Sequence, residues 1–249
     1  MQAVLFPPVC AACGTATLDS ADALCLSCWE ELSLVIGHAY CMSCGEDRQD
    51  YLLTDGQCTK CRIGDTPYRF DGFARVGRYD GTLRQLILSF KRRFVLDGLL
   101  GKLLGDAILG RFEPGDVDYW VPVPAHWRRR LRVGFQPTWL LACAATKRWG
   151  GRVEPVLAAK RYVRPFHTRV GLSAQARAEA IRGVFRACGG WDLRGKTVCV
   201  VDDVTTTGAT LREARGVLRK AGAKKVLAAV LAKAASGGPA GLDQVGRVT

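Results

Sequence analysis

The sequence predicts an α/β fold, a doubly wound parallel sheet that follows a small cysteine-rich module. Strand-like apolar runs alternate with helix-like segments between residues 70 and 232, which is the pattern of a parallel sheet covered by helices. One of these strands leads into two adjacent acids and a loop of hydroxyl residues. Eight of the 11 cysteines precede Arg62, and all eight fall into CxxC pairs.

The elements of the sheet domain follow from the spacing of apolar residues. Val198 to Val201 is a short β-branched run, typical of a buried parallel strand, and apolar positions recur at helical spacing from Leu211 to Leu218. The same criteria predict, in chain order, a strand or hairpin arm over residues 70–79, helices over 80–91 and 96–109, a strand over 118–124, a helix over 137–148, a strand over 196–202, a helix over 210–221 and a strand over 225–232. Ligands of such a sheet bind beyond the carboxyl ends of its strands.

The segment from Asp202 to Thr210 is the strongest functional signal in the chain. Two acids stand at the predicted end of a strand, and hydroxyl residues with one glycine lead into a helix. Backbone N–H groups of such a loop bind phosphate together with the helix dipole, and Gly208 allows close approach. The acids would repel phosphate unless they hold sugar hydroxyls or Mg²⁺. A strand that ends in a solvated, Asp-rich turn is the alternative.

This segment resembles the signature of type I phosphoribosyltransferases, which bind phosphoribosyl pyrophosphate. The resemblance implies that Asp202 and Asp203 hold the ribose hydroxyls. It also implies that the loop wraps the 5′-phosphate, with Thr205, Thr206, Thr207, Gly208, Ala209 and Thr210 as its residues. In that family the loop after an early strand meets the pyrophosphate, so the expected site includes Arg128 and Arg132, together with Lys91.

A second basic segment runs over residues 160–186, and we expect it near the ligand as well. It includes Arg161, Arg164, His167, Arg169, Arg177 and Arg182. For both basic segments, a solvated basic face is the alternative to a pyrophosphate contact. His167 alone is more typical of a surface or loop histidine than of an acid–base catalyst.

The N-terminal cysteines predict two zinc ions. A CxxC turn can bind one metal ion with two thiolates, and two such turns complete a tetrahedral zinc site. The pairs are Cys10/Cys13, Cys25/Cys28, Cys41/Cys44 and Cys58/Cys61. The unit CxxCG followed by CxxC occurs twice, offset by 31 to 33 residues, which favours two consecutive sites over an interleaved pairing. The isolated Cys143, Cys188 and Cys199 are expected to pack as small apolar groups.

Disulfides are the alternative use of these cysteines. The segment from Met1 to Pro8 lacks the basic start and the long apolar core of a secretion signal. We therefore expect a cytoplasmic protein, in which such cysteines bind metal rather than form disulfides. No apolar stretch of the sequence is long and uncharged enough to span a bilayer.

Charge divides the chain near residue 65. Residues 1–65 hold 3 Lys and Arg against 9 Asp and Glu, a net of −6, which leaves +19 on the remainder of a chain whose total is +13. Each four-thiolate zinc site adds about −2 to the first part. We expect a double zinc ribbon over residues 1–65, a sheet domain over 66–235 and a disordered tail over 236–249. Opposite charges should draw the two folded modules together.

Along almost its whole length the chain resembles the ComF family, which joins a double zinc ribbon to a phosphoribosyltransferase-like domain. Matching segments lie at residues 5–10, 79–81, 83–84, 90–91, 121–124, 134–135, 171–173 and 201–210, with Arg177 and Phe185. The family usually reads Gly-Phe-Asn-Gln where this chain has Gly134-Phe135-Gln136-Pro137. It also usually has Gln before Gly171 and Asn after Arg177, where the nearest residues here are Arg169 and Ala180. These positions lie on the side expected to cover an acceptor.

The family is associated with natural competence. The resemblance therefore implies that the protein handles incoming single-stranded DNA in the bacterial cytoplasm. It also implies a DNA-uptake motor or other competence proteins as candidate partners. A transferase reaction is inferred for this family from its fold.

Three functions fit these residues. An enzyme would transfer the phosphoribosyl group of Mg²⁺-bound phosphoribosyl pyrophosphate to an unidentified base or amine and release pyrophosphate. A binding protein would hold single-stranded DNA on its basic domain through arginines, with stacking on Trp127 or Phe135. An adaptor would dock its acidic ribbon on a DNA-uptake motor. The sequence favours phosphoribosyl binding first, DNA binding second and turnover last.

Overall fold

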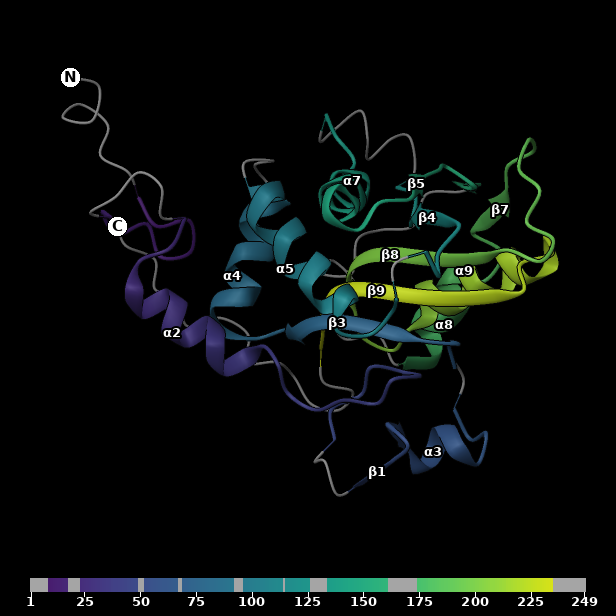
Figure 1. Cartoon of the computed structure of the whole chain (residues 1–249), viewed down its shortest axis with the longest axis horizontal. Coiled ribbons are helices and arrows are strands. Elements are labelled where there is room, and N and C mark those ends of the chain that lie inside the picture. The colour runs from purple at the N-terminus through teal and green to yellow at the C-terminus, as the bar shows by residue number, and fades with distance from the viewer. Residues whose placement is uncertain are drawn as a thin grey trace.

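A five-stranded parallel sheet forms the centre of the molecule. The computed structural model describes residues 9–17, 23–48, 52–66, 69–91, 96–113, 115–125, 134–160 and 174–234. The strand order is β3-β9-β8-β4-β5, and every neighbouring pair is parallel (Figure 1). The strands are β3 (Phe73–Arg78), β4 (Tyr119–Pro122), β5 (Arg152–Val153), β8 (Thr197–Thr205) and β9 (Lys225–Lys233). The predicted α/β fold is confirmed.

Helices cover both faces of the sheet. The first face carries α4 (Gly81–Phe90), α5 (Asp97–Leu109) and α7 (Pro137–Trp149), and the second carries α8 (Ala174–Ile181) and α9 (Ala209–Lys220) (Figure 1). Four of these helices lie where apolar spacing predicted them. Helix α8 lies within residues 160–186, where the sequence indicated only basic character. Two short strands flank that helix and pair with each other, β6 (Leu157–Ala159) just before this segment and β7 (Phe185–Ala187) at its end.

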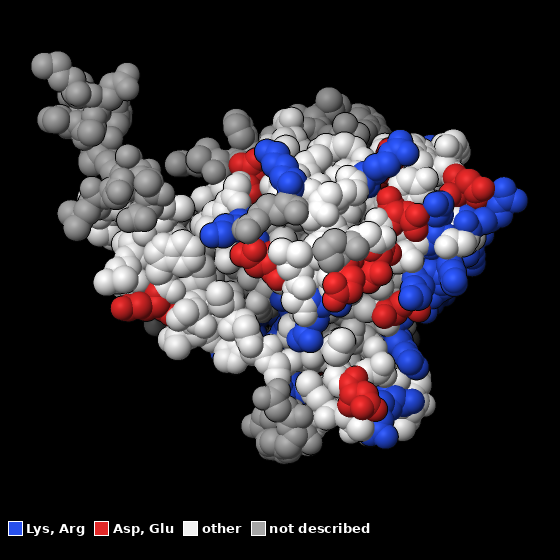
Figure 2. All heavy atoms as spheres, viewed as in Figure 1, with Lys and Arg blue, Asp and Glu red and all other residues white. Residues whose placement is uncertain are grey.

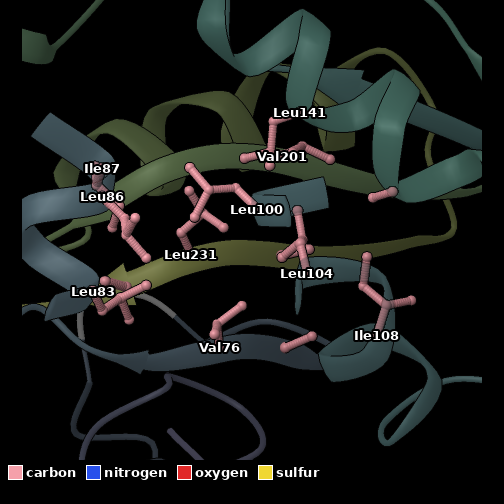
Figure 3. Packing of buried hydrophobic residues seen from close by; sticks show 14 of the residues in the cluster. Val76, Leu83, Leu86, Ile87, Leu100, Leu104, Ile108, Leu141, Val201 and Leu231 are labelled. Atoms are coloured by element: carbon pink, nitrogen blue, oxygen red, sulfur yellow. The ribbon is translucent and has the colours of Figure 1, made fainter. Parts of the chain in front are cut away.

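The first face holds one continuous apolar core. Leu83, Leu86 and Ile87 of α4 meet Leu100, Leu104 and Ile108 of α5, Leu141 of α7, and the strand residues Val76, Val201 and Leu231 (Figure 3). Each of these side chains lies almost wholly out of solvent. Cys199 of β8 is buried in the same cluster, which confirms that it packs as a small apolar group.

Strand β8 is longer than the sequence predicted. The expected strand ended at Asp202, but pairing with β9 continues through Val204 and Thr205, which face Ala232 and Lys233. The reason is that β9 is equally long and supplies backbone partners to the end. Both acids of the signature segment therefore lie inside β8 rather than beyond it.

The two cysteine-rich units lie on opposite faces of the sheet. The first, with α2 (Leu26–Val35), joins the core of the first face through residues such as Leu32 and Val35. The second contains β1 (Leu53–Thr54), β2 (Gln57–Cys58) and α3 (Thr59–Arg62), and its cysteines join the core of the second face beside Phe73. The chain between the units crosses β3, where Ile36 makes an antiparallel bridge to Gly77.

Opposite charges hold the second unit to the sheet, as the division of charge predicted. Asp47 pairs with Arg75 of β3, and Glu46 pairs with Lys233 of β9. The ring of Tyr40 lies between two guanidinium groups, 4.6 Å from that of Arg75 and 4.4 Å from that of Arg111.

Some expectations fall on residues that the structure does not describe. The predicted tail, 236–249, is one of them, and the segments 126–133 and 161–173 are two more. Among the described residues, none of the helices has the length and apolarity needed to cross a bilayer.

Two equivalent glycines test how closely the second unit packs on the sheet. Gly14 and Gly45 follow corresponding CxxC turns and have φ of 78° and 69°. A Cβ at Gly45 would stand 2.4 Å from Cε1 of the buried Phe73, whereas one at Gly14 would meet nothing within 4 Å. Because alanine is strained at both positions, any difference between Gly45→Ala and Gly14→Ala reports the packing alone.

We expect Gly45→Ala to lower the free energy of unfolding by about 1–3 kcal/mol more than Gly14→Ala does. Urea denaturation of the two zinc-loaded variants measures the difference. Equal losses would show that the second unit stands clear of Phe73.

Candidate functional site

Each cysteine-rich unit gathers four thiols into one cluster. Cys10, Cys13, Cys25 and Cys28 form the first cluster, and Cys41, Cys44, Cys58 and Cys61 form the second, with the four sulfurs of each within 4.8 Å of one another. The Sγ atoms of Cys13 and Cys25 are 3.7 Å apart, and those of Cys44 and Cys58 are 3.9 Å apart. Tetrahedral zinc with Zn–S bonds of about 2.3 Å places its sulfurs about 3.8 Å apart. The thiols therefore fit two zinc ions, in the consecutive pairing that the repeat predicted.

The first half of each unit repeats the same turn. Gly14 N–H donates to the Cys10 carbonyl at 2.9 Å, and Gly45 N–H donates to the Cys41 carbonyl at 2.8 Å. The residue after each glycine accepts a hydrogen bond from the first cysteine's N–H, at 2.8 Å for Thr15 and 3.0 Å for Glu46. The glycine is required because its φ is positive.

The two clusters differ in their exposure to solvent. All four cysteines of the second cluster are buried, whereas in the first Cys13 is exposed and Cys25 is half-buried. A hydrogen bond from the Cys44 thiol lowers the pKa of the Cys41 thiol, although burial opposes this shift. The backbone N–H of Cys58 also donates to the Cys41 sulfur and lowers its pKa further. A sulfur that is held ionised inside the protein is a ready zinc ligand.

The acid pair forms the sixth and seventh residues of the nine in β8. Asp202 is 9% exposed, and the Asp203 side chain is mostly buried as well. Each carboxylate accepts a hydrogen bond from the next backbone N–H, Asp202 from that of Asp203 at 2.9 Å and Asp203 from that of Val204 at 2.6 Å. Alternation along β8 sends successive side chains to opposite faces, so the two carboxylates differ in their surroundings.

Lys91 stands directly beside the acid pair. It ends α4, and its Nζ lies 3.0 Å from Oδ2 of Asp203. Both side chains are mostly buried, at 22% and 14% exposed, so this ion pair is screened less than a surface pair would be. Of the cationic residues that the sequence assigned to the site, Lys91 is the one that the described residues bring to the acids.

The hydroxyl loop joins β8 to α9 in three residues. Thr205 is the last residue of β8 and is buried, and Thr206, Thr207 and Gly208 make the connection. Gly208 has φ of 72° and caps α9 without a side-chain hydrogen bond. The left-handed backbone by itself favours glycine here, and the close approach of a ligand that the sequence suggested stays a prediction. The first N–H groups of α9, from Ala209 onward, have no acceptor within the helix.

The remaining site candidates are placed only in part. Arg128 and Arg132 lie outside the described residues, as do Trp127, Arg161, Arg164, His167 and Arg169; of Arg177 only the backbone is described. Segment 126–133, which contains Trp127, Arg128 and Arg132, follows β4 in the sequence. At the carboxyl end of β4 the Val123 N–H donates to the Val201 carbonyl at 2.8 Å. Phe135 packs on Phe90 with ring centroids 6.4 Å apart, which ties its ring to the core beside Lys91.

One contact at the site was missed by sequence reasoning. The Nζ of Lys233 donates to the Thr206 carbonyl at 3.0 Å and lies 3.2 Å from Oε2 of Glu46. Two signals point to it in retrospect. A lysine directly follows the apolar run of β9, and the second CxxCG is followed by Glu46 and Asp47, where the first is followed by Thr15 and Ala16.

The unequal exposure of the clusters predicts two rates of zinc loss. A chromogenic chelator should remove zinc from the first cluster first, because it reaches Cys13 from solvent, and remove zinc from the buried second cluster slowly. Cys13→Ser should abolish the fast phase and leave the slow phase in place. Release of both equivalents in a single phase would show that burial does not control access.

The chain matches two families of known domains. The double zinc ribbon domain matches residues 1–62, and the phosphoribosyl transferase domain matches residues 173–245. Part of a solved structure, the glutamine phosphoribosylpyrophosphate amidotransferase from B. subtilis complexed with ADP and GMP, is 23% identical. That match covers 58% of this chain and 27% of that one with a TM-score of 0.36.

Two curated proteins resemble the chain over most of its length. The DNA utilization protein YhgH of Escherichia coli K12 is 30% identical over 191 residues, which are 75% of this chain and 80% of the relative. Competence protein F of Haemophilus influenzae is 30% identical over 219 residues, which are 86% of this chain and 91% of the relative. With its double zinc ribbon joined to a phosphoribosyltransferase domain, the chain belongs to the ComF family.

Proposed function

We propose that this protein binds phosphoribosyl pyrophosphate with Mg²⁺ at the carboxyl end of β8 and handles incoming single-stranded DNA in the cytoplasm during natural competence. The observation that carries the proposal is the acid pair near the end of β8, because only three residues, the last of them the N-cap Gly208, separate the end of that strand from the N-terminus of α9. Acids and a phosphate-binding turn at one strand end suit a ligand with both hydroxyls and phosphates.

Each part of the ligand has suitable partners in this chain. The carboxylates of Asp202 and Asp203 would accept hydrogen bonds from the two ribose hydroxyls. The first N–H groups of α9 and the hydroxyls of Thr206, Thr207 and Thr210 would donate to the 5′-phosphate. Lys91 keeps Asp203 paired, which lowers the repulsion between this carboxylate and an incoming anion.

Mg²⁺ is expected with the diphosphate rather than as a resident ion. It binds through substrate phosphate oxygens with one or two carboxylates, and the mostly buried oxygens of Asp203 fit that role. When bound, the ion would neutralise diphosphate charge. The arginines of segment 126–133, which leaves the neighbouring strand β4, are proposed to complete that neutralisation.

The names of the relatives and the charge of the chain support the part of the proposal that concerns DNA. One relative is named a competence protein and another a DNA utilization protein. Residues 66–249 carry a net charge of +19. Lys220, Lys224 and Lys225 are exposed where α9 ends and β9 begins. Figure 2 shows Lys and Arg gathered at the right of the view, where Figure 1 places that end of α9.

Replacing the acid pair tests the ligand. We expect Asp202→Asn with Asp203→Asn to weaken Mg²⁺-dependent binding of phosphoribosyl pyrophosphate about a hundredfold or more, because two charge-assisted contacts are lost. Isothermal titration calorimetry measures the affinity. Asp118→Asn is the matched control, because its carboxylate pairs with Lys196 at the amino end of β8 and should matter only for stability. Unchanged affinity in the double variant would place the ligand elsewhere.

An assay of pyrophosphate release decides between binding and turnover. Wild-type protein is incubated with Mg²⁺, phosphoribosyl pyrophosphate and candidate acceptors, namely free bases, amines and single-stranded DNA. Release of pyrophosphate would establish a phosphoribosyltransferase, the alternative function. Binding without release would establish a binding protein that uses the fold without the reaction.

Charge reversal on two basic surfaces tests DNA binding. Arg128→Glu, Arg129→Glu and Arg130→Glu form one variant, and Lys220→Glu, Lys224→Glu and Lys225→Glu form the other. Whichever surface holds single-stranded DNA should lose affinity for all base sequences, because phosphate contacts carry no sequence information. In a plot of the logarithm of the DNA association constant against the logarithm of the salt concentration, the steepness of the negative slope should decrease by about 2 when three phosphate contacts are lost.

Lys60→Glu with Arg62→Glu is the control for this experiment. It makes the same kind of change on α3 of the acidic ribbon and should leave DNA binding in place. If the control loses as much affinity as the two test variants, only overall charge matters. Full affinity in both test variants would contradict the proposed interface.

A further inference from the structure

We infer that Lys233 is a positioning residue for the hydroxyl loop, the proposed phosphate-binding loop. Through Lys233 the second cysteine-rich unit, which is the second zinc ribbon, holds this loop in its binding conformation. The inference rests on the function proposed above for that loop. Lys233 is the last residue of β9, and its side chain is 2% exposed. Its ammonium donates to the Thr206 carbonyl at 3.0 Å and lies 3.2 Å from the Glu46 carboxylate. One buried cation thus joins the ribbon to the loop.

The position of the ammonium is fixed by the sheet. Thr205 of β8 faces Lys233 in the ladder, the Tyr79 N–H donates to the Lys233 carbonyl at 3.0 Å, and the Ala234 N–H donates to the Thr205 carbonyl at 2.9 Å. The backbone of Lys233 is therefore held from both neighbouring strands, β8 and the end of β3. A side chain that starts from a backbone held in this way can hold the loop in place.

The ammonium orients one peptide group of the loop. The Thr206–Thr207 peptide is planar and trans, as nearly all peptides are, so its C=O and N–H point in opposite directions. When Lys233 holds the Thr206 carbonyl, the Thr207 N–H points away from the ribbon. A carbonyl that faced the ligand would repel a phosphate, whereas an N–H attracts one. Lys233 thereby keeps the repulsive group of this peptide turned away.

The ribbon supplies the charge that Lys233 needs. A buried ammonium is costly unless an acid pairs with it, and Glu46 supplies that acid. The zinc-binding turn fixes the backbone of Glu46, because the Cys41 N–H donates to the Glu46 carbonyl at 3.0 Å. The equivalent residue of the first ribbon is Thr15, which has no charge. The link to the loop is therefore built into the second ribbon.

Glu46→Gln tests this role in the full, zinc-loaded chain. Without the carboxylate, Lys233 loses its counter-charge and should hold Thr206 less firmly. We expect amide hydrogen exchange over residues 203–210 to become about tenfold faster, and the dissociation constant for ribose 5-phosphate to rise about tenfold, the effect of one charge-assisted hydrogen bond. Hydrogen exchange is read by mass spectrometry and needs no ligand.

Asp47→Asn is the matched control. This variant also deprives a buried cation of its acidic partner in the same ribbon. The cation here is Arg75 of β3, which does not contact the loop in the contacts described above. Exchange over residues 203–210 should stay at the wild-type rate. If Asp47→Asn speeds exchange as much as Glu46→Gln does, the ribbon supports the whole domain and the role of Lys233 is refuted. If Glu46→Gln exchanges its amides over residues 203–210 at the wild-type rate, the role of Lys233 is refuted as well.

Two changes at Lys233 complete the test. Lys233→Arg keeps the charge and the donor, so its exchange rates over residues 203–210 should stay near wild type. Lys233→Met should speed exchange over these residues as much as Glu46→Gln does. In the double variant Glu46→Gln with Lys233→Met, exchange should be no faster than in Lys233→Met alone, because both changes break one connection. Additive effects would contradict that connection. If wild-type protein fails to bind ribose 5-phosphate, the proposed function fails, and hydrogen exchange still tests the link.

Discussion

Two buried cations on neighbouring strands make the sheet domain and the second zinc ribbon depend on each other. Arg75 and Lys233 are almost wholly withdrawn from solvent, at 1% and 2% side-chain exposure. A charge removed from water must be paired, and leaving one unpaired costs about 3–5 kcal/mol. The partners, Asp47 and Glu46, come from the ribbon. Since a domain of this size is stable by about 5–15 kcal/mol in total, the sheet needs the ribbon's acids, and the acids are held in place by the zinc-binding turn.

The features that sequence predicted are those encoded in neighbouring residues. The β-branched run before Asp202, the helical spacing after Gly208 and the CxxC repeat each need only a short stretch of chain to be recognised. The repeat even gave the correct pairing of cysteines, because two equivalent turns must make two equivalent sites. The parallel sheet followed from the order of strands and helices.

The features that sequence did not predict depend on residues far apart in the chain. Strand β8 continues past Asp202 because β9 is there to pair with it, which no local pattern of β8 reveals. Glu46 meets Lys233 across most of the chain's length. Strands β6 and β7 are three residues each, too short for a periodic signal, and they form through pairing with each other. The ion pair of Lys91 with Asp203 belongs to the same class, because α4 has to lie against β8 before the two can meet.

The path of the chain between the two ribbons also determines how the molecule behaves toward copies of itself. Among the residues that the structure describes, β3 is the last strand on its side of the sheet, and no strand of that set pairs with its outer row of backbone groups. The linker occupies part of that row through Ile36 at Gly77, where a Cβ would meet the Val35 carbonyl at 2.3 Å. Exposed strand edges invite edge-to-edge association with other chains. The linker is anchored on either side by a zinc ribbon, so metal loading also keeps this edge covered, and the metal-free chain would offer it as a template for aggregation.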